Sequence, residues 1–263
     1  MLTIQVSSEI RERCPEFVGT AVFASVSNSE FNEELWQEID RFIADYRQRY
    51  TTDSIKQMPS IEATRTAYRR CGKDPSRYRP SGEALVRRTL QGKDLYRVNT
   101  LVDLINLASI AFGYSIGGFD ADKISVSSGS PAGTPTLLLG IGREGEPYEG
   151  IGRGPLNIAG LPVYRDALGG IGTPTSDHER TKLSLETTQL LSIVNGYDGN
   201  RENTTACAEY IQELLRRYCT SDGGHLIQFS SSPPTSSSPP PSSHLLLFPA
   251  SLLPSSFFIL ERL

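Results

Sequence analysis

The order of the periodic patterns along the chain limits the fold more than any other feature. Apolar residues recur at helical spacing near 60–71, 82–91 and 99–112, and again in 202–219. Between them, residues 113–197 hold short apolar runs separated by glycine and proline. Helices grouped around a block of strands are typical of an α+β fold, whereas βαβ folds alternate the two. The strands that we predict in this block are 124–126, 137–141, 161–164, 182–185 and 190–194.

Two further segments flank this region. Residues 1–64 hold strand-like runs at 4–6 and 17–25 and a helical stripe that ends near Tyr46, which predicts a small α/β lead-in. Residues 65–219 would form the main domain. Residues 220–263 include a stretch of almost only serine and proline at 230–243, which cannot build a packed core. We predict that 220–263 is a disordered tail.

Charge and cysteine content exclude several classes of protein. With 26 basic and 30 acidic residues, the net charge of −4 argues against a general nucleic-acid coat protein. The four cysteines form no CxxC pair, so neither a disulfide scaffold nor structural zinc is expected. The sequence does not begin like a secretory leader, and prolines interrupt its long apolar stretch at 244–260. We expect a cytoplasmic protein without a membrane span or a metal.

Two motifs are rejected as functional signals. Gly140, Gly142 and Gly145 fit the GxGxxG pattern, but Pro147 follows where a dinucleotide-binding helix would have to begin. A glycine-rich hairpin fits better, so no cofactor is expected. His178 is the only histidine before the predicted tail, which leaves little material for a Ser-His-Asp triad or a histidine-rich metal site.

A basic cluster occupies residues 65–97, which contain ten lysines and arginines but three acidic residues. Tyr68, Tyr78 and Tyr96 are interspersed with them. Positive charge combined with aromatic rings suits a phosphate backbone and stacked bases. An ordinary solvated surface would have the same composition, so the cluster alone does not identify a polyanion.

Polar residues also gather on short turns between 160 and 180. Loops held by strands are frequent positions for binding residues, although the same residue types are common turn formers. Both interpretations stay open for this set: Arg165, Asp166, Thr173, Thr175, Ser176, Asp177 and Arg180.

Three segments together resemble a known family: Arg79–Arg88, Val98–Asn106 and Gly118–Ile124. They are similar to the B3/B4 domain of the phenylalanyl-tRNA synthetase β subunit, and the resemblance spans roughly 65–217. Val163–Asp166 and Gly172–Asp177 look more like its free-standing relatives. The resemblance implies a three-layer α+β fold with a mixed β-sandwich and flanking helices.

The resemblance also implies a function. In the synthetase, the module hydrolyses the ester when tyrosine has replaced phenylalanine on the tRNA. A free-standing relative would bind aminoacyl-tRNA and remove a mischarged amino acid in trans, as a deacylase. It would lack aminoacylation activity, because a synthetase core does not fit beside this domain in 263 residues. The implied partner is tRNA, with neither DNA nor a membrane.

The resemblance places the site residues in three groups. Asp166, Thr173 and Asp177 would position substrate or water, with Asp166 a possible general base. Phosphate would bind to Arg79, Arg87 and Arg88. The substrate pocket would include Asn99, Asn106, Gly169, Gly170 and Glu186.

Two positions depart from the family pattern. Ile105 stands where the family has a threonine, and Gly117 where it has a histidine. Two alternatives therefore stay open: a non-catalytic module that binds tRNA or an amino acid, and a hydrolase of a small ester or amide.

Overall fold

Two β-sheets face each other in the computed structural model, which describes residues 2–125 and 136–232. The mixed sheet has the order β1 (Thr3–Val6), β4 (Thr136–Ile141), β7 (Pro162–Asp166), β8 (Gly169–Gly172), and its β1 runs parallel to β4. The antiparallel sheet has the order β10 (His225–Ser230), β2 (Val18–Ser25), β9 (Gln189–Gly196), β3 (Ile116–Asp120). A small hairpin joins β5 (Glu149–Gly150) to β6 (Gly154–Pro155).

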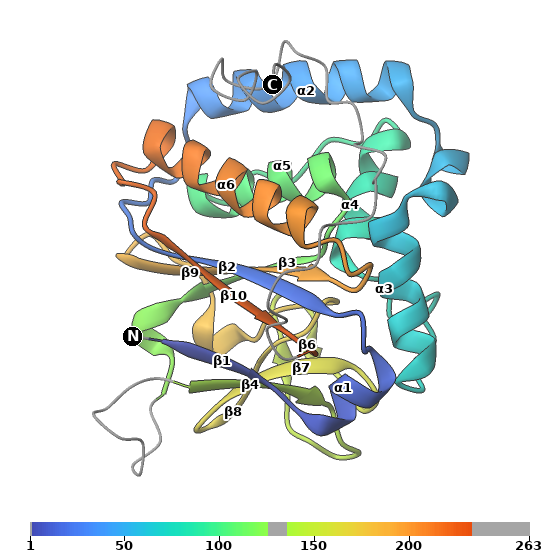
Figure 1. The fold of residues 1–263 in the computed structure, drawn as a ribbon. Helices are drawn as coiled ribbons and strands as arrows, with labels where there is room; N and C mark the ends of the chain where they lie inside the picture. Colours follow the sequence, from blue (N-terminus) through green and yellow to red (C-terminus); the bar gives the residue numbers. More distant parts are fainter. Residues whose placement is uncertain (1, 126–135, 233–263) are drawn as a thin grey trace, which may run out of the picture.

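Helices cover the face of the antiparallel sheet that points away from the mixed sheet (Figure 1). α5 (Thr100–Phe112) and α6 (Arg201–Tyr218) lie next to the sheet, and α2 (Glu33–Arg49) lies above them. α3 (Pro59–Arg70) and α4 (Ser81–Leu90) stand at one side, and the short α1 (Ser8–Arg13) follows β1. Short 3₁₀ turns in the described part of the chain are η1 (Thr52–Gln57), η2 (Ala121–Lys123) and η4 (Glu179–Thr181). The predicted α+β fold with layered sheets and flanking helices is confirmed.

The alternation of side chains along β9 explains how the layers are held together. Leu191 and Ile193 point into the space between the sheets, where they join Phe119 of β3. Leu190 and Val194 point the other way and pack under the helices. Because successive residues of a strand face opposite sides, one strand contributes to both cores.

The predicted separate lead-in at 1–64 is wrong as a structural unit. β2 lies between β9 and β10 in the antiparallel sheet, and β1 pairs with β4. On α2, Glu38 accepts a hydrogen bond of 2.6 Å from the Tyr218 hydroxyl of α6. The first 64 residues therefore complete both sheets and the helical layer. Without β2, one side of β9 would have no strand to pair with, and β9 would become an edge strand.

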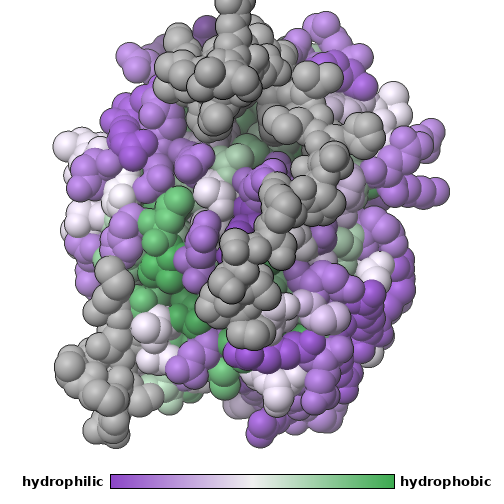
Figure 2. All heavy atoms as spheres, in the orientation of Figure 1, coloured by the Kyte–Doolittle hydropathy of each residue, from purple (hydrophilic) through white to green (hydrophobic). Residues whose placement is uncertain are grey.

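The predicted disordered tail is wrong for its first part. Residues 225–230 form β10, which pairs with β2 along its whole length. The ring of Phe229 lies over Gly19, where an added Cβ would come within 2.2 Å of it, and packs 5.9 Å from the Phe17 ring. Figure 2 shows an apolar area on the face that β10 crosses in Figure 1. Residues 233–263, with the serine and proline run from 233 on, lie outside the described residues.

Two predicted strands are also wrong. Ile124 and Ser125 follow the 3₁₀ turn η2 and belong to no strand, and Val126 lies outside the described residues. Segment 182–185 is irregular, because the Thr187 hydroxyl accepts the backbone N–H of Ser184 at 2.9 Å and turns the chain. The helices near 60–71, 82–91, 99–112 and 202–219 and the strands at 137–141, 161–164 and 190–194 are confirmed within a few residues.

Sequence patterns missed the strands β3 and β8. Both contain adjacent glycines, which are depleted in strands, so neither has the usual signature. The GxGxxG segment belongs to the end of β4 and a turn, and the next helical element within 136–232 is η4. The helix that a dinucleotide-binding motif would need directly after its glycines does not follow this segment.

The described residues contain no helix long and apolar enough to cross a membrane, and 244–260 lies outside them. The four cysteines, Cys14, Cys71, Cys207 and Cys219, are buried free thiols. Across 2–125 and 136–232, no group of three or more histidine, cysteine or acidic side chains is arranged to hold a metal ion.

Candidate functional site

Helix α4 is the wall between two pockets. Ser81 and Leu85, one turn apart, line a small pocket, and Glu83 and Arg87, also one turn apart, line a larger one. At about 100° per residue, positions 81 and 83 lie on nearly opposite faces of the helix. The two pockets therefore share one rigid element.

The smaller cavity, called the polar pocket below, has a volume of ≈ 150 Å³. It lies between α4, α5, β3 and the turn at 173–177. Its lining combines hydroxyl, amide and carboxyl groups with three aliphatic side chains: Ser81, Leu85, Ile105, Asn106, Ser109, Ile116, Thr173, Ser176 and Asp177. Three of the predicted site residues, Asn106, Thr173 and Asp177, meet here.

Asp177 is the titratable group of the polar pocket. Its Oδ2 accepts a hydrogen bond of 3.0 Å from the backbone N–H of Gly118. Burial raises the pKa of Asp177 to about 7, and the Gly118 N–H offsets part of that rise. A carboxyl group with such a pKa exchanges a proton near neutral pH, which is a requirement for a general base.

Two glycines lie beside the Asp177 carboxyl group and the Phe119 ring. A Cβ on Gly172 would lie 3.0 Å from Oδ1 of Asp177, and a Cβ on Gly117 would lie 3.5 Å from it. Both would also approach the Phe119 ring, to 2.4 Å and 2.7 Å respectively. A side chain at position 172 would therefore crowd this carboxyl group, whereas Gly117, which the resemblance marks as a departure, makes room for the Phe119 ring.

Thr173 shapes the turn that carries Asp177. Its hydroxyl donates to the carbonyl oxygen of Ser176 at 3.0 Å and accepts the N–H groups of Thr175 and Ser176. The Tyr148 hydroxyl donates to the same Ser176 carbonyl at 2.8 Å. The hydroxyl proton of Thr173 is therefore engaged, and the predicted role in holding substrate or water is replaced by a positioning role.

Asn106 is the polar side chain that α5 presents to the pocket. It is partly exposed, and its amide has no hydrogen-bond partner within 2–125 and 136–232. An amide carries both donors and an acceptor, so Asn106 can bind either kind of group on a ligand. Its neighbour Ile105 packs against Gly118, where an added Cβ would come within 2.9 Å of Cδ1.

Asp166 does not fit the predicted role of general base. The Arg180 guanidinium binds both its carboxylate oxygens, at 2.9 and 2.8 Å, and the N–H groups of Ser125, Leu168 and Gly169 donate to them. Burial raises the pKa of Asp166, but these bonds outweigh it and lower the pKa overall. The Asp166 carboxylate is therefore ionised, both its oxygens already accept hydrogen bonds, and it links β7 to η4.

Four predicted pocket residues lie outside the polar pocket. Asn99 caps α5, with its Oδ1 accepting the N–H of Val102 at 3.1 Å. Gly169 and Gly170 begin β8, where Gly170 faces the Tyr148 ring. Glu186 lies on an exposed turn. Each of these positions is explained by the turn, strand or cap that it belongs to.

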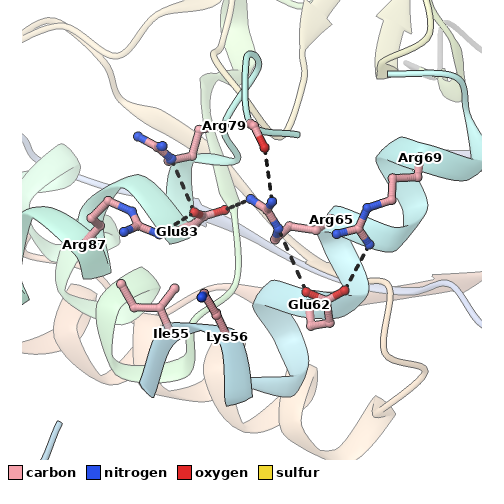
Figure 3. A pocket seen from close by; sticks show the side chains of 9 residues that line it. Ile55, Lys56, Glu62, Arg65, Arg69, Arg79, Glu83 and Arg87 are labelled. Atoms are coloured by element: carbon pink, nitrogen blue, oxygen red, sulfur yellow. Dashed lines mark hydrogen bonds and ion pairs between the residues drawn. The ribbon is translucent and has the colours of Figure 1, made fainter. Parts of the chain in front are cut away.

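The larger cavity, called the basic pocket below, has a volume of ≈ 370 Å³. Figure 3 shows arginine side chains from α3, the following loop and α4 converging in it. Its lining includes five cations and two carboxylates among nine residues: Ile55, Lys56, Glu62, Arg65, Arg69, Ser76, Arg79, Glu83 and Arg87. The formal charge of the lining is therefore +3.

The buried carboxylate of Glu83 holds three arginines of the basic pocket in place. Its side chain is 2% exposed, and Arg65 binds Oε2 at 2.8 Å. Arg87 and Arg79 bind Oε1 at 3.0 and 3.3 Å (Figure 3). One buried carboxylate thus holds three guanidinium groups together, which would otherwise repel one another.

The Arg88 side chain does not line the basic pocket. Its Nε donates to the carbonyl oxygen of Asp94 at 2.5 Å, and its guanidinium lies 4.0 Å from the centre of the Tyr96 ring. Of the predicted phosphate ligands, Arg79 and Arg87 therefore share a pocket and Arg88 does not. Lys56, Arg65 and Arg69 were missed. The two arginines belong to the basic cluster, whereas Lys56 lies before it in the sequence.

A family model, described as the B3/4 domain, matches residues 63–220, more than half of the chain. The chain belongs to the B3/4 domain family. The predicted resemblance is thereby confirmed, and both pockets are built largely from the matched residues. Strands β1, β2 and β10 lie outside the match and complete the two sheets of this B3/4 protein.

Among solved structures, the chain is similar to an N-terminal fragment of the phenylalanyl-tRNA synthetase β-subunit from Pyrococcus horikoshii. The sequence identity is 14% and the TM-score is 0.40. The alignment covers 86% of this chain and 50% of that chain, so the B3/4 protein spans about half of the fragment. No curated protein matches the sequence.

Proposed function

We propose that this B3/4 protein binds aminoacyl-tRNA and hydrolyses the ester of a mischarged amino acid, without charging tRNA itself. The observation that carries the proposal is the pair of pockets on opposite faces of α4. One contains a carboxyl group that titrates near neutral pH, and the other has an excess of positive charge. An amino acid attached to a polyanion needs both. A cytoplasmic location belongs to the same proposal, since tRNA is used there.

The polar pocket suits an amino-acid side chain. Its ≈ 150 Å³ match a cavity of about 150 Å³ that holds benzene in another protein. Leu85, Ile105 and Ile116 provide apolar contact, while the Asn106 amide and the Ser81 hydroxyl provide polar contact. Such a mixed lining suits an aromatic or aliphatic side chain with a polar end.

The chemistry assigned to the pocket is ester hydrolysis with Asp177 as general base. Ionised Asp177 would take a proton from a water molecule as its oxygen attacks the ester carbonyl carbon. The bond from that carbon to the ribose oxygen then breaks, and the proton that Asp177 took from water would pass to the ribose oxygen, which leaves Asp177 ionised again. Free amino acid and uncharged tRNA leave. Asn106 is positioned to donate to the carbonyl oxygen or to the side chain.

The basic pocket supports the nucleic-acid half of the proposal. Arginine is suited to phosphate because its planar group offers several donors in a fixed arrangement. Five cations against two carboxylates attract a polyanion although the whole chain is acidic. We therefore assign phosphate binding to Arg79 and Arg87, joined by Arg65, Arg69 and Lys56.

The proposal is tested by deacylation of a panel of mischarged tRNAs with the full chain, including tyrosine on tRNA(Phe). Binding is measured alongside at several salt concentrations. Turnover of one member, together with binding that weakens as salt rises, supports the proposal. Rates equal to buffer for every member would contradict it, and cleavage of small amino-acid esters alone would indicate a hydrolase without nucleic acid.

A non-catalytic binding module is the second candidate. Two observations favour it: Ile105 adds no polar group to the pocket, and the Thr173 hydroxyl is engaged in its own turn. Tight, salt-dependent tRNA binding without turnover would support this candidate over the first.

A further inference from the structure

The charges of the basic pocket converge on one point. Cations from three separate segments, η1, α3 and the stretch from residue 79 to 87, surround a single cavity. Glu83 fixes the guanidinium groups of Arg65, Arg79 and Arg87 around itself (Figure 3). A phosphate backbone that runs along a surface needs cations in a row. A cluster around a hollow suits one compact anion instead.

Donors remain available after the internal contacts are made. Arg79 and Arg87 each use one nitrogen on Glu83, although a guanidinium has five N–H donors. The Nε of Arg87 is buried and has no partner in the described part of the chain. Lys56 is exposed, and its ammonium has no partner there either. The buried Arg87 Nε is out of reach of a ligand, so the donors that the pocket presents are the unused terminal nitrogens of Arg79 and Arg87 and the Lys56 ammonium.

The charge balance distinguishes two kinds of phosphate. The lining carries a formal charge of +3. A phosphate monoester has a charge of about −2 near pH 7 and three terminal oxygens, whereas each internal diester has a charge of about −1 and two. The monoester therefore matches both the charge and the number of donors better.

We propose that the basic pocket binds a phosphate monoester, and that the ligand is the 5′-terminal phosphate of an RNA. This inference rests on the proposed function, because it places the 5′ end of a tRNA beside its aminoacylated end. The two pockets lie across one helix, whose diameter is about 10 Å. In a tRNA the 5′ terminus pairs with the acceptor strand, and the unpaired 3′ nucleotides that carry the amino acid would fold back toward this pair to bring the ester across the helix.

The experiment compares an RNA acceptor-stem hairpin that has a 5′-phosphate with the same hairpin ending in a 5′-hydroxyl. Binding to the full chain is measured without any amino acid attached. We expect the 5′-hydroxyl hairpin to bind about tenfold more weakly, as for the loss of charge-assisted hydrogen bonds. Equal affinities for the two hairpins would overturn the proposal.

Single substitutions test whether the preference for the 5′-phosphate arises in the basic pocket. Arg87→Ala and Lys56→Ala should abolish the preference for the 5′-phosphate. Arg88→Ala, one residue along α4 but stacked on Tyr96, should keep the preference even if overall affinity changes. If Arg88→Ala abolishes the preference and Arg87→Ala keeps it, the assignment to this pocket is wrong.

Competition and turnover separate this inference from the proposed function. A nucleoside 5′-monophosphate that binds as tightly as the hairpin would mean a free nucleotide and overturn the RNA assignment. A 5′-phosphate preference without deacylation would support this inference while the proposed function fails. Deacylation without any preference for the 5′-phosphate would support the proposed function and overturn this inference.

Discussion

Asp177 and Gly118 are joined by a hydrogen bond of 3.0 Å from the backbone N–H to Oδ2. The bond links the turn at 173–177 to β3, two segments that are 59 residues apart. Gly172 leaves room for the carboxyl group beside it. The candidate base is therefore held by main chain, and its position does not depend on another titratable side chain.

Replacing Asp177 tests its chemical role. We expect Asp177→Asn to lower the rate of deacylation about 100-fold or more while tRNA binding is kept, because the amide cannot take a proton. The rate of deacylation is measured as release of the amino acid under single-turnover conditions. The matched control is Asp45→Asn, an exposed position on α2, which should react at the wild-type rate. Equal losses in both variants would contradict the role.

The raised pKa of Asp177 also makes a prediction about stability. The folded pKa is about 7, against 3.8 for an unperturbed aspartate. The folded state thus holds the proton more tightly, so this group's contribution to stability is full below about pH 4 and is lost as pH rises through about 7. Urea unfolding between pH 5 and 8 should show wild type losing more stability than Asp177→Asn. Parallel curves would contradict the raised pKa.

Glu83 should be the most sensitive carboxylate for stability. Glu83→Gln leaves three arginines around a buried neutral group, and we expect a loss of about 3 kcal/mol in the free energy of unfolding. Glu62→Gln, which removes a partly exposed carboxylate from the same pocket, should cost less than about 1 kcal/mol. Denaturant titration measures both, and equal losses would argue against Glu83 as the organiser.

Strand β10 should contribute to the folded core. Phe229→Ala removes a ring that packs on Gly19, Phe17 and Tyr164, and we expect a loss of about 3 kcal/mol. Gln228→Ala, at the exposed neighbour on the same strand, should cost less than about 1 kcal/mol. If the two variants unfold at the same denaturant concentration, β10 is peripheral.

Local patterns predicted the α+β class and the helices, but only part of the sheets. β9 has four apolar residues around a single serine, Ser192, a pattern that predicts a buried strand, and the structure has this strand. β3 and β8 pair through adjacent glycines, whose place in a sheet depends on neighbours distant in sequence. β10 was missed because its six residues directly precede the serine and proline run and were judged together with it.

The same limit applies to the site. Asn106 and Asp177 were found through motifs and do share a pocket. Asp166 has the same residue type on a similar turn, yet Arg180, fourteen residues later, binds both its oxygens. Sequence shows which groups are available, whereas the partner that saturates one of them is set by tertiary packing. Lys56 was missed for this reason, since only packing brings it to the basic pocket.

The central claim is that the polar pocket hydrolyses an aminoacyl ester with Asp177 as the base. The most direct measurement is the single-turnover rate of amino-acid release from the best panel substrate as a function of pH. We expect a rate that rises with pH through about 7 in the wild type and is nearly absent in Asp177→Asn. Release by Asp177→Asn with the same rate and the same pH profile as wild type would contradict it.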